Sequence, residues 1–320
     1  MYNNQTHIGN MKKSIQPIKR GTSNVSVLAL MARIKGSQIH KSVGFDTLAM
    51  EFRVFHTSGE DQRSIMLAYK GIHTLIRSVF YPKFDYTKVK ASRPKTAYET
   101  REVSKEEYLR RLANQPQATG KEGGILFAKT VEDCHLLAMH EADLLMAEKD
   151  VLYRSFMEFV VSNGYEVLEA EMILMDPFLG YATWVDLVVA KGGCVYFVEI
   201  KTGYGNGAFL SGTGCMNGVA GKLFKNDCKC NQAMLQALLP VLTVSRFAKA
   251  CVTPVVWHVQ PSGVDEYLPP WNLGDLAARC RLHNTFLSDI HETAQTAKNE
   301  ALMPPITRVE SAKKKQKVLS

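Results

Sequence analysis

Strand-like patterns are clearest in the middle of the chain. Residues 165–175 alternate between apolar and polar positions, and two longer apolar runs follow at residues 182–190 and 194–201. Side chains alternate between the two faces of a strand, and a short glycine turn joins strands that pair antiparallel. Because a Lys-Gly-Gly segment separates the last two runs, the pattern predicts three strands, of which the last two form a hairpin.

Helical patterns lie on both sides of these strands. Residues 128–149 and 150–161 have the pattern of helices, the second of which ends at an Asn-Gly pair, and residues 229–239 have that of another. Pro240 is expected to end that helix, because proline has no amide hydrogen to donate. Residues 251–260 have the pattern of a fourth strand. The order of helix, three strands, helix and strand predicts an α/β fold with a mixed sheet flanked by helices.

The first third of the chain gives weaker signals. Near-helical spacing predicts a helix over residues 61–80, and a capping pattern predicts a short helix over residues 104–112. We divide the chain into four parts: residues 1–24, a flexible basic arm; residues 25–120, an N-terminal extension of unassigned role; residues 121–275, the core domain; and residues 276–320, a C-terminal helix and basic tail.

The composition is that of an ordinary globular protein, with 46% hydrophobic and 22% charged residues. No apolar stretch is long enough to cross a membrane, so we expect no membrane partner. The cysteines number seven and no secretory signal is present. These features favour an intracellular protein with reduced thiols.

The net charge of +8 lies at the two ends of the chain. Residues 1–45 contain seven Lys or Arg and no acid, and residues 307–320 have a net charge of +4, which leaves −3 for the middle. Basic ends can hold a polyanion through the release of counterions. A solubilising or targeting tail explains the same charge equally well.

Three charged side chains lie on the predicted hairpin. Asp186 belongs to its first strand, and Glu199 and Lys201 lie near the end of its second strand. Antiparallel pairing would bring Asp186 beside Glu199, and strand alternation would place Glu199 and Lys201 on one face. Burying charges in a sheet is costly unless they are paired or bind a metal. An ordinary ion pair on a surface hairpin is the alternative, because Glu-x-Lys alone is a common pattern.

Metal binding explains the combination. Mg²⁺ prefers oxygen ligands, so Asp186 and Glu199 would hold it with the backbone carbonyl of Ile200 between them. The metal would polarise a scissile phosphate and help to form hydroxide from water. Lys201 would orient or deprotonate that water, or stabilise the charge that develops on the phosphate.

The hairpin resembles the core of the PD-(D/E)XK nucleases, in the RecB-type branch that includes phage lambda exonuclease-like and viral alkaline nucleases. The resemblance rests on the spacing from Asp186 to Glu199 and on the Glu-Ile-Lys-Thr-Gly segment. It covers residues 124–260 and does not cover residues 1–120. It implies a restriction-endonuclease-like fold, a requirement for Mg²⁺ or Mn²⁺, and hydrolysis of phosphodiester bonds in nucleic acid.

The resemblance implies two further site residues. One is an acidic or His residue on the helix before the first strand, where Glu132 is the nearest match. The same helix carries four rivals for this position: Asp133, His135, His140 and Glu141. The other is a Gln on the helix after Glu-x-Lys. Gln232 is preferred to Gln236, because the branch usually shows Tyr four residues after the Gln. Glu171, on the first strand, faces either the site or solvent.

Basic residues precede the helix of Gln232. Lys222, Lys225 and Lys229, with Phe224 among them, would bind a nucleic-acid strand by phosphate contact and stacking. A solvated charged loop has the same composition. The glycine-rich stretch after Lys201 lacks the Gly-Lys-Ser/Thr of a nucleotide-binding loop, so we expect hydrolysis to be independent of ATP.

These observations favour a deoxyribonuclease, an exonuclease rather than an endonuclease, that acts on DNA in replication, recombination or repair, with other proteins of these processes as partners. The alternatives are a non-catalytic nucleic-acid-binding protein on the same fold and a nuclease subunit that is active only with a partner. A run of lysines in residues 313–317 resembles a nuclear import signal. It favours the nucleus, or a virus-encoded protein working there, over the mitochondrion or the cytoplasm.

Overall fold

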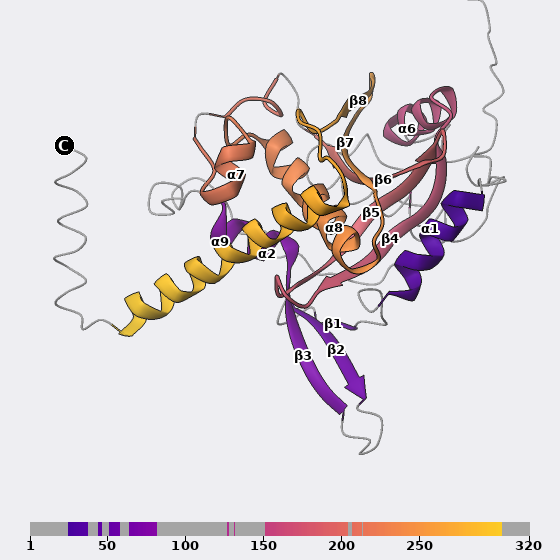
Figure 1. The fold of residues 1–320 in the computed structure, drawn as a ribbon. Coiled ribbons are helices and arrows are strands. Elements are labelled where there is room, and N and C mark those ends of the chain that lie inside the picture. Colours follow the sequence, from indigo (N-terminus) through magenta and orange to yellow (C-terminus); the bar gives the residue numbers. More distant parts are fainter. Residues whose placement is uncertain are drawn as a thin grey trace, which may run out of the picture.

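The computed structural model shows a mixed α/β protein with helices on both faces of a sheet (Figure 1). It describes residues 25–37, 44–46, 51–57, 64–81, 127, 131, 151–203, 207–212 and 214–302. The helices are α1 (Val25–Gly36), α2 (Ile72–Val79), α6 (Val151–Ser162), α7 (Gly218–Leu223), α8 (Lys229–Phe247) and α9 (Leu276–Leu302). The predicted fold class, a mixed sheet flanked by helices, is confirmed.

The strands are β1 (Gly44–Asp46), β2 (Glu51–Thr57), β3 (Ser64–Gly71), β4 (Glu166–Asp176), β5 (Tyr181–Lys191), β6 (Cys194–Thr202), β7 (Thr253–Gln260) and β8 (Gly263–Tyr267). Among the described residues they form an eight-stranded sheet in the order β1-β2-β3-β5-β6-β7-β8, and β4 pairs with β5 off this path. β3 runs parallel to β5 and β6 runs parallel to β7, whereas the other pairs are antiparallel. The four strands predicted from the apolar runs are confirmed to within two residues.

Helices α6 and α8 cover opposite faces of the sheet because its central strands are apolar on both faces. On β5, Leu187 and Val189 pack in the cluster that contains α6, whereas Val188 and Ala190 pack in the cluster that contains α8. Strands with two buried faces have near-continuous apolar sequences. The apolar runs seen in the sequence therefore follow from the position of these strands between two layers of helices.

The prediction that Pro240 ends a helix is wrong, because α8 continues through Pro240 to Phe247. A proline inside a helix removes a hydrogen bond and costs roughly 3 kcal/mol. The apolar residues that follow it, Val241, Leu242 and Val244, are fully buried. Each such side chain contributes about 1.5–3 kcal/mol on burial. Packing beyond the proline thus outweighs the local break.

The helix predicted over residues 61–80 is wrong in its first part. Residues 64–71 form β3, which pairs along its length with β2, and α2 begins only at Ile72. A short apolar run fits a strand and a helix equally well, and the pairing partner decides between them. The remaining part of the prediction is confirmed by α2, whose residues Ile72, Leu75 and Ile76 are buried in the cluster that contains α8.

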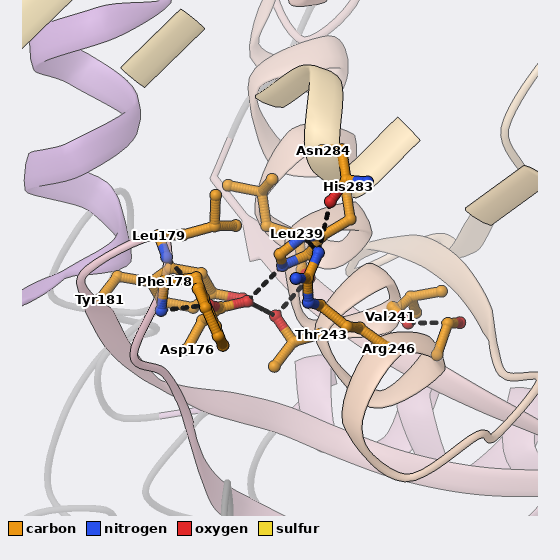
Figure 2. Close-up of polar contacts among 11 residues, drawn as sticks. Asp176, Phe178, Leu179, Tyr181, Leu239, Val241, Thr243, Arg246, His283 and Asn284 are labelled. Atoms are coloured by element: carbon orange, nitrogen blue, oxygen red, sulfur yellow. Dashed lines mark hydrogen bonds and ion pairs between the residues drawn. The ribbon is translucent and has the colours of Figure 1, made fainter. Parts of the chain in front are cut away.

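A buried polar network fastens α9 to the sheet (Figure 2). Asp176, at the end of β4, accepts hydrogen bonds from Thr243 of α8 at 2.8 Å and from His283 of α9 at 2.6 Å. Its second carboxylate oxygen accepts from two backbone amides of the turn that follows β4. Arg246 lies 3.3 Å from the other ring nitrogen of His283. Because a guanidinium only donates, this geometry fits the His283 tautomer with its hydrogen on Nε2.

Several predictions lie outside the described residues. They concern the arm at residues 1–24, the short helix at residues 104–112, most of the helix at residues 128–149, and the chain after residue 302. Val131 is described and is helical. The helices predicted over residues 150–161 and near the C-terminus are confirmed by α6 and α9. In the described part of the chain, no helix is both long and apolar enough to span a membrane.

Candidate active site

The two carboxylates of the hairpin lie opposite each other where β5 and β6 separate. The antiparallel ladder between these strands ends at Leu187 and Val198. Continuing its register by one pair places Asp186 opposite Glu199. The start of β5 pairs instead with β3. Asp186 therefore lies in the interval between the two ladders, and the structure brings it beside Glu199 as the sequence predicted.

A hydrogen bond crosses this interval. The backbone amide of Ile200 donates to Oδ2 of Asp186 at 2.7 Å. A side-chain carboxylate thus takes the place of a backbone carbonyl as the acceptor on β5. Hydrogen bonds to an ionised carboxylate are stronger than those between neutral groups. The bond fixes Asp186 against the segment of β6 that contains Glu199.

Glu199 and Lys201 share one face of β6, as strand alternation predicted. Nζ of Lys201 makes an ion pair with Oε1 of Glu199. The same face of β6 carries Val195 and Phe197, which pack in the cluster that contains α8. The charged residues therefore lie on the α8 side of the sheet, at the border of its apolar core.

The carboxyl group of Asp186 titrates far from its ordinary range. Although the side chain keeps some exposure to solvent, burial of the carboxyl group and the charge of Glu199 raise the pKa of Asp186 to about 7. The charge of Lys201, the amide of Ile200 and the charge of His73 act in the opposite direction. Two carboxylates held together at the edge of an apolar core are destabilised by mutual repulsion, and a bound cation would relieve it.

His73 lies near enough to this site to interact electrostatically with its charged residues, and no sequence pattern pointed to it. It lies in the first turn of α2. Although the residue is exposed to solvent on one side, partial burial of its imidazole together with the charge of Lys201 lowers its pKa, while the charge of Asp186 raises it. The residue comes from the N-terminal extension, to which the sequence assigned no role. No motif surrounds His73, and the pairing of β3 with β5 brings α2 to the site. That pairing is not readable from the sequence.

The two glutamines of α8 have different surroundings. Gln232 donates to Asp227 at 2.7 Å and accepts from Lys229 at 3.1 Å, so its amide is bound to the start of α8 and the segment before it. Gln236 is 6% exposed and donates to the hydroxyl of Tyr81 at 3.5 Å. Tyr81 follows α2, the helix that carries His73. Gln236 is therefore the glutamine that connects α8 to α2.

The lysines predicted to contact nucleic acid are exposed. Lys222 lies on α7, Lys225 lies between α7 and α8, and Lys229 is the first residue of α8. Phe224 is 2% exposed and packs edge-on against Trp271. The prediction that a base stacks on Phe224 is therefore wrong, and only the phosphate contacts remain available to this segment.

Of the other acidic candidates, the structure describes only Glu171. Glu132 and its four rivals on the same helix lie outside the described residues. Glu171 lies on β4, in register with Asp186 on the far side of β5 from β6. Its φ of 50° falls in the left-handed region, which is strained for a residue with a side chain. The charged residues that shift the pKa of Asp186 are Glu199, Lys201 and His73.

The donor set fits an open metal site. Among the described residues, no group of three or more His, Cys, Asp or Glu side chains could by itself hold a metal ion. Asp186, Glu199 and the carbonyl of Ile200 supply only oxygen donors. Mg²⁺ usually takes one or two carboxylates and completes its coordination with water and substrate phosphate. The hydrogen bond from Ile200 to Asp186 and the raised pKa of Asp186 agree with two carboxylates held close together.

The network of Asp176, Thr243 and His283 also combines acidic, hydroxyl and imidazole groups. These three residues are completely buried. Asp176 binds both Thr243 and His283, as Figure 2 shows. A substrate has no path to a group with no exposed surface. We interpret the network as structural.

No protein-family model and no curated protein sequence matches the chain.

Proposed function

We propose that this protein is a metal-dependent nuclease of the PD-(D/E)XK type with a restriction-endonuclease-like core. The observation that carries the proposal is the juxtaposition of Asp186 and Glu199, with Lys201 on the same face of β6. The order α6, β4, β5, β6, α8 and β7 supports it, because this order places helices on both sides of the catalytic hairpin. Burying two carboxylates side by side is costly unless they are paired or bind a cation, and a bound metal would offset that cost.

Asp186, Glu199 and the carbonyl of Ile200 would hold Mg²⁺ or Mn²⁺. When bound, the cation would polarise the scissile phosphate and favour ionisation of a water molecule. Asp186 must lose its proton to serve as a ligand, and the hydrogen bond from Ile200 orients it in the ionised form. Glu199 would act as the second ligand and as the partner that holds the ammonium group of Lys201.

Lys201 would bring its amine to the attacking water or to the phosphate oxygens. A lysine in this position can orient or deprotonate water and can stabilise negative charge in the transition state. His73 of α2 would interact electrostatically with Asp186 and Lys201 and assist the reaction. Gln232 and Glu132 remain proposed supporting residues, and Lys222, Lys225 and Lys229 remain proposed phosphate contacts.

DNA is the proposed substrate, cleaved without ATP and from an end rather than internally. The proposed setting is replication, recombination or repair in the nucleus. The first experiment measures cleavage of end-labelled linear DNA and of closed circular DNA with Mg²⁺, Mn²⁺ or EDTA. Wild type is compared with Lys201→Ala and with Lys298→Ala, a lysine of α9 that serves as the control. We expect cleavage of linear DNA that needs the metal, is lost in Lys201→Ala and persists in Lys298→Ala.

Other outcomes would point elsewhere. Cleavage of closed circles would favour an endonuclease. Tight, salt-sensitive DNA binding without cleavage under any metal would contradict the proposal and favour a non-catalytic DNA-binding protein. Metal binding without cleavage by the purified chain would favour a subunit whose activity needs a partner.

A further inference from the structure

Lys201 has a titratable neighbour on the next strand of the sheet. β6 and β7 run parallel, and Lys201 pairs with His258 in this ladder. β7 and β8 run antiparallel, and His258 pairs with Asp265. Paired residues on neighbouring strands project from the same face, with Cβ atoms about 5 Å apart. Lys201, His258 and Asp265 thus form a row across three strands on the side of the sheet that carries Glu199.

His258 is held firmly in this row. Its side chain is 2% exposed, and the ring of Phe209 stacks on the imidazole with centroids 4.3 Å apart and planes 19° apart. The carbonyl of Phe209 accepts a hydrogen bond of 3.0 Å from the amide of Cys230, in the first turn of α8. Oδ2 of Asp265 lies 3.9 Å from Nδ1 of the imidazole. The stacked ring of Phe209, itself tied to the start of α8, therefore fixes the imidazole beside Lys201, and the carboxylate of Asp265 lies near it.

A lysine that acts in catalysis must be held in one conformation by the residues around it. Its side chain has four rotatable bonds, and holding them in one conformation is opposed by the loss of rotamer entropy. Misplacing a catalytic group by about 1 Å can lower a rate by about 100-fold. Burial lowers the pKa of His258, although the charge of Asp265 raises it. The imidazole is therefore neutral at neutral pH, so it can pack along the stem of Lys201 without repelling its ammonium group.

We propose that His258 is a positioning residue that confines the side chain of Lys201 to the conformation directed at Glu199, with the stacked ring of Phe209 holding the imidazole in place. The kinetic consequence rests on the proposed nuclease function. The placement of Lys201 does not, because it can be measured without any cleavage. His258 acts through Lys201, so its removal should change the rate of the chemical step rather than the binding of DNA.

The test compares wild type with three variants of the full chain. His258→Ala removes the ring, His258→Phe restores a flat ring that can stack on Phe209, and Val259→Ala removes buried volume from the neighbouring residue, which packs on the α6 side of the sheet. The first readout is the rate at which acetic anhydride modifies Lys201 relative to Lys298, mapped by mass spectrometry. The second readout is kcat and KM for linear DNA with Mg²⁺.

We expect acetylation of Lys201 to rise several-fold in His258→Ala, while kcat falls about 10- to 100-fold and KM stays within about twofold. His258→Phe should reverse both changes, and Val259→Ala should show neither. Equal acetylation of Lys201 in His258→Ala and Val259→Ala would overturn the proposal. Increased acetylation of Lys201 in His258→Ala, with a kcat equal to that of Val259→Ala, would also overturn the proposal.

The two proposals fail in different ways. If wild type cleaves no DNA with Mg²⁺ or Mn²⁺, the nuclease proposal fails, and the acetylation rates alone then decide whether His258 positions Lys201. If His258→Ala does not fold, Phe209→Leu takes its place, because it removes the stacked ring and leaves the imidazole. The same rise in acetylation is expected, and its absence would overturn the proposal.

Discussion

The carboxylate of Asp186 and the backbone amide of Ile200 are joined by a hydrogen bond of 2.7 Å, at the point where the ladder between β5 and β6 ends. This bond gives the carboxylate two roles. It completes the pairing of two central strands, and it holds one of the proposed metal ligands beside Glu199. The two roles are separable, because an amide oxygen can accept the same hydrogen bond without carrying a charge.

Asp186→Asn should therefore keep the fold and lose the activity. The asparagine oxygen still accepts from Ile200, so thermal unfolding should occur at or above the wild-type temperature. Without the second carboxylate, cleavage should fall by more than about 100-fold, as expected when electrostatic stabilisation of the transition state is removed. Asp186→Ala is the comparison, since an unsatisfied amide should cost about 1–3 kcal/mol. Cleavage by Asp186→Asn at the wild-type rate would remove Asp186 from the mechanism.

The raised pKa of Asp186 predicts a pH-dependent stability in the absence of metal. Between the ordinary pKa of an aspartate and about 7, the folded protein binds a proton that the unfolded chain releases. This contribution to stability is therefore present at acid pH and is lost as the pH rises through 7. In EDTA, wild type should lose a few degrees in Tm relative to Asp186→Asn between pH 5 and pH 8, at about 2–4 °C per kcal/mol.

Added Mg²⁺ or Mn²⁺ should reverse that loss at pH 8, because a cation replaces the proton between the carboxylates. Its apparent affinity should weaken as the pH falls, by up to about tenfold per pH unit below 7 for one displaced proton. Calorimetric titrations at several pH values measure this directly. A metal affinity that does not change with pH would place the cation elsewhere in the molecule.

His73 tests whether the N-terminal extension contributes to the site. Its imidazole is electrostatically coupled to Asp186 and Lys201, so His73→Ala should lower kcat by about 100-fold or more, as expected for the loss of one group that assists proton transfer. Thr74→Ala changes the next exposed residue of α2 and should leave kcat unchanged. Equal activity of the two variants would show that α2 is only a structural neighbour of the site.

The exposed lysines around α7 predict a salt-dependent contribution to DNA binding. Each phosphate contact to duplex DNA contributes about 0.9 to the slope of log Kobs against log salt. Replacing Lys222, Lys225 and Lys229 together by Ala should weaken binding and reduce the slope by roughly 2 to 3. Fluorescence anisotropy at several salt concentrations measures the slope. Lys298→Ala should not change it, and an unchanged slope in the triple variant would place the DNA on another surface.

The network of Asp176 and His283 predicts large effects on stability. Removing one member of a buried polar pair typically costs about 3–5 kcal/mol, because the remaining group loses its partner. Asp176→Ala and His283→Ala should each approach this cost in urea denaturation, and the double variant should cost less than their sum. Asp275→Asn, at the exposed start of α9, retains a capping oxygen. It should cost little, and strict additivity in the double variant would contradict the pairing.

Local sequence predicted the parts of the site that depend on adjacent strands. The hairpin of β5 and β6 is closed by two glycines with positive φ, Gly192 and Gly193. The register that follows from this turn sets Asp186 against Glu199, and alternation sets Glu199 beside Lys201. These relationships need no knowledge of the remaining fold, and each was predicted.

The features that local sequence did not predict depend on contacts between segments far apart in the chain. The sequence of β3 fits a helix as well as a strand, and its pairing with β2 makes it a strand. No sequence pattern marks His73 as a site residue, and the pairing of β3 with β5 brings it to the site. Pro240 ends a helix by local rules, yet the helix continues where its next turns are buried. Phe224 carries an aromatic ring among lysines, and only its packing on Trp271 shows that the ring is not available. In each case burial or pairing with a distant segment overrides a local preference.

The parallel pairing of β3 with β5 has a consequence for the order of folding. In β3, Lys70 and Gly71 pair with Tyr181 and Ala182 of β5. The strands β1–β3 therefore cannot join the central part of the sheet until β5 has been synthesised. Until β5 and α8 have been synthesised, the apolar face of α2 lacks the core residues that these two elements supply in the folded protein. Contacts this distant in sequence slow folding, because a long loop must be ordered before any pairing energy is gained. The chain should therefore reach its native state slowly, with the β5–β6 hairpin forming before the segment that carries His73 joins it.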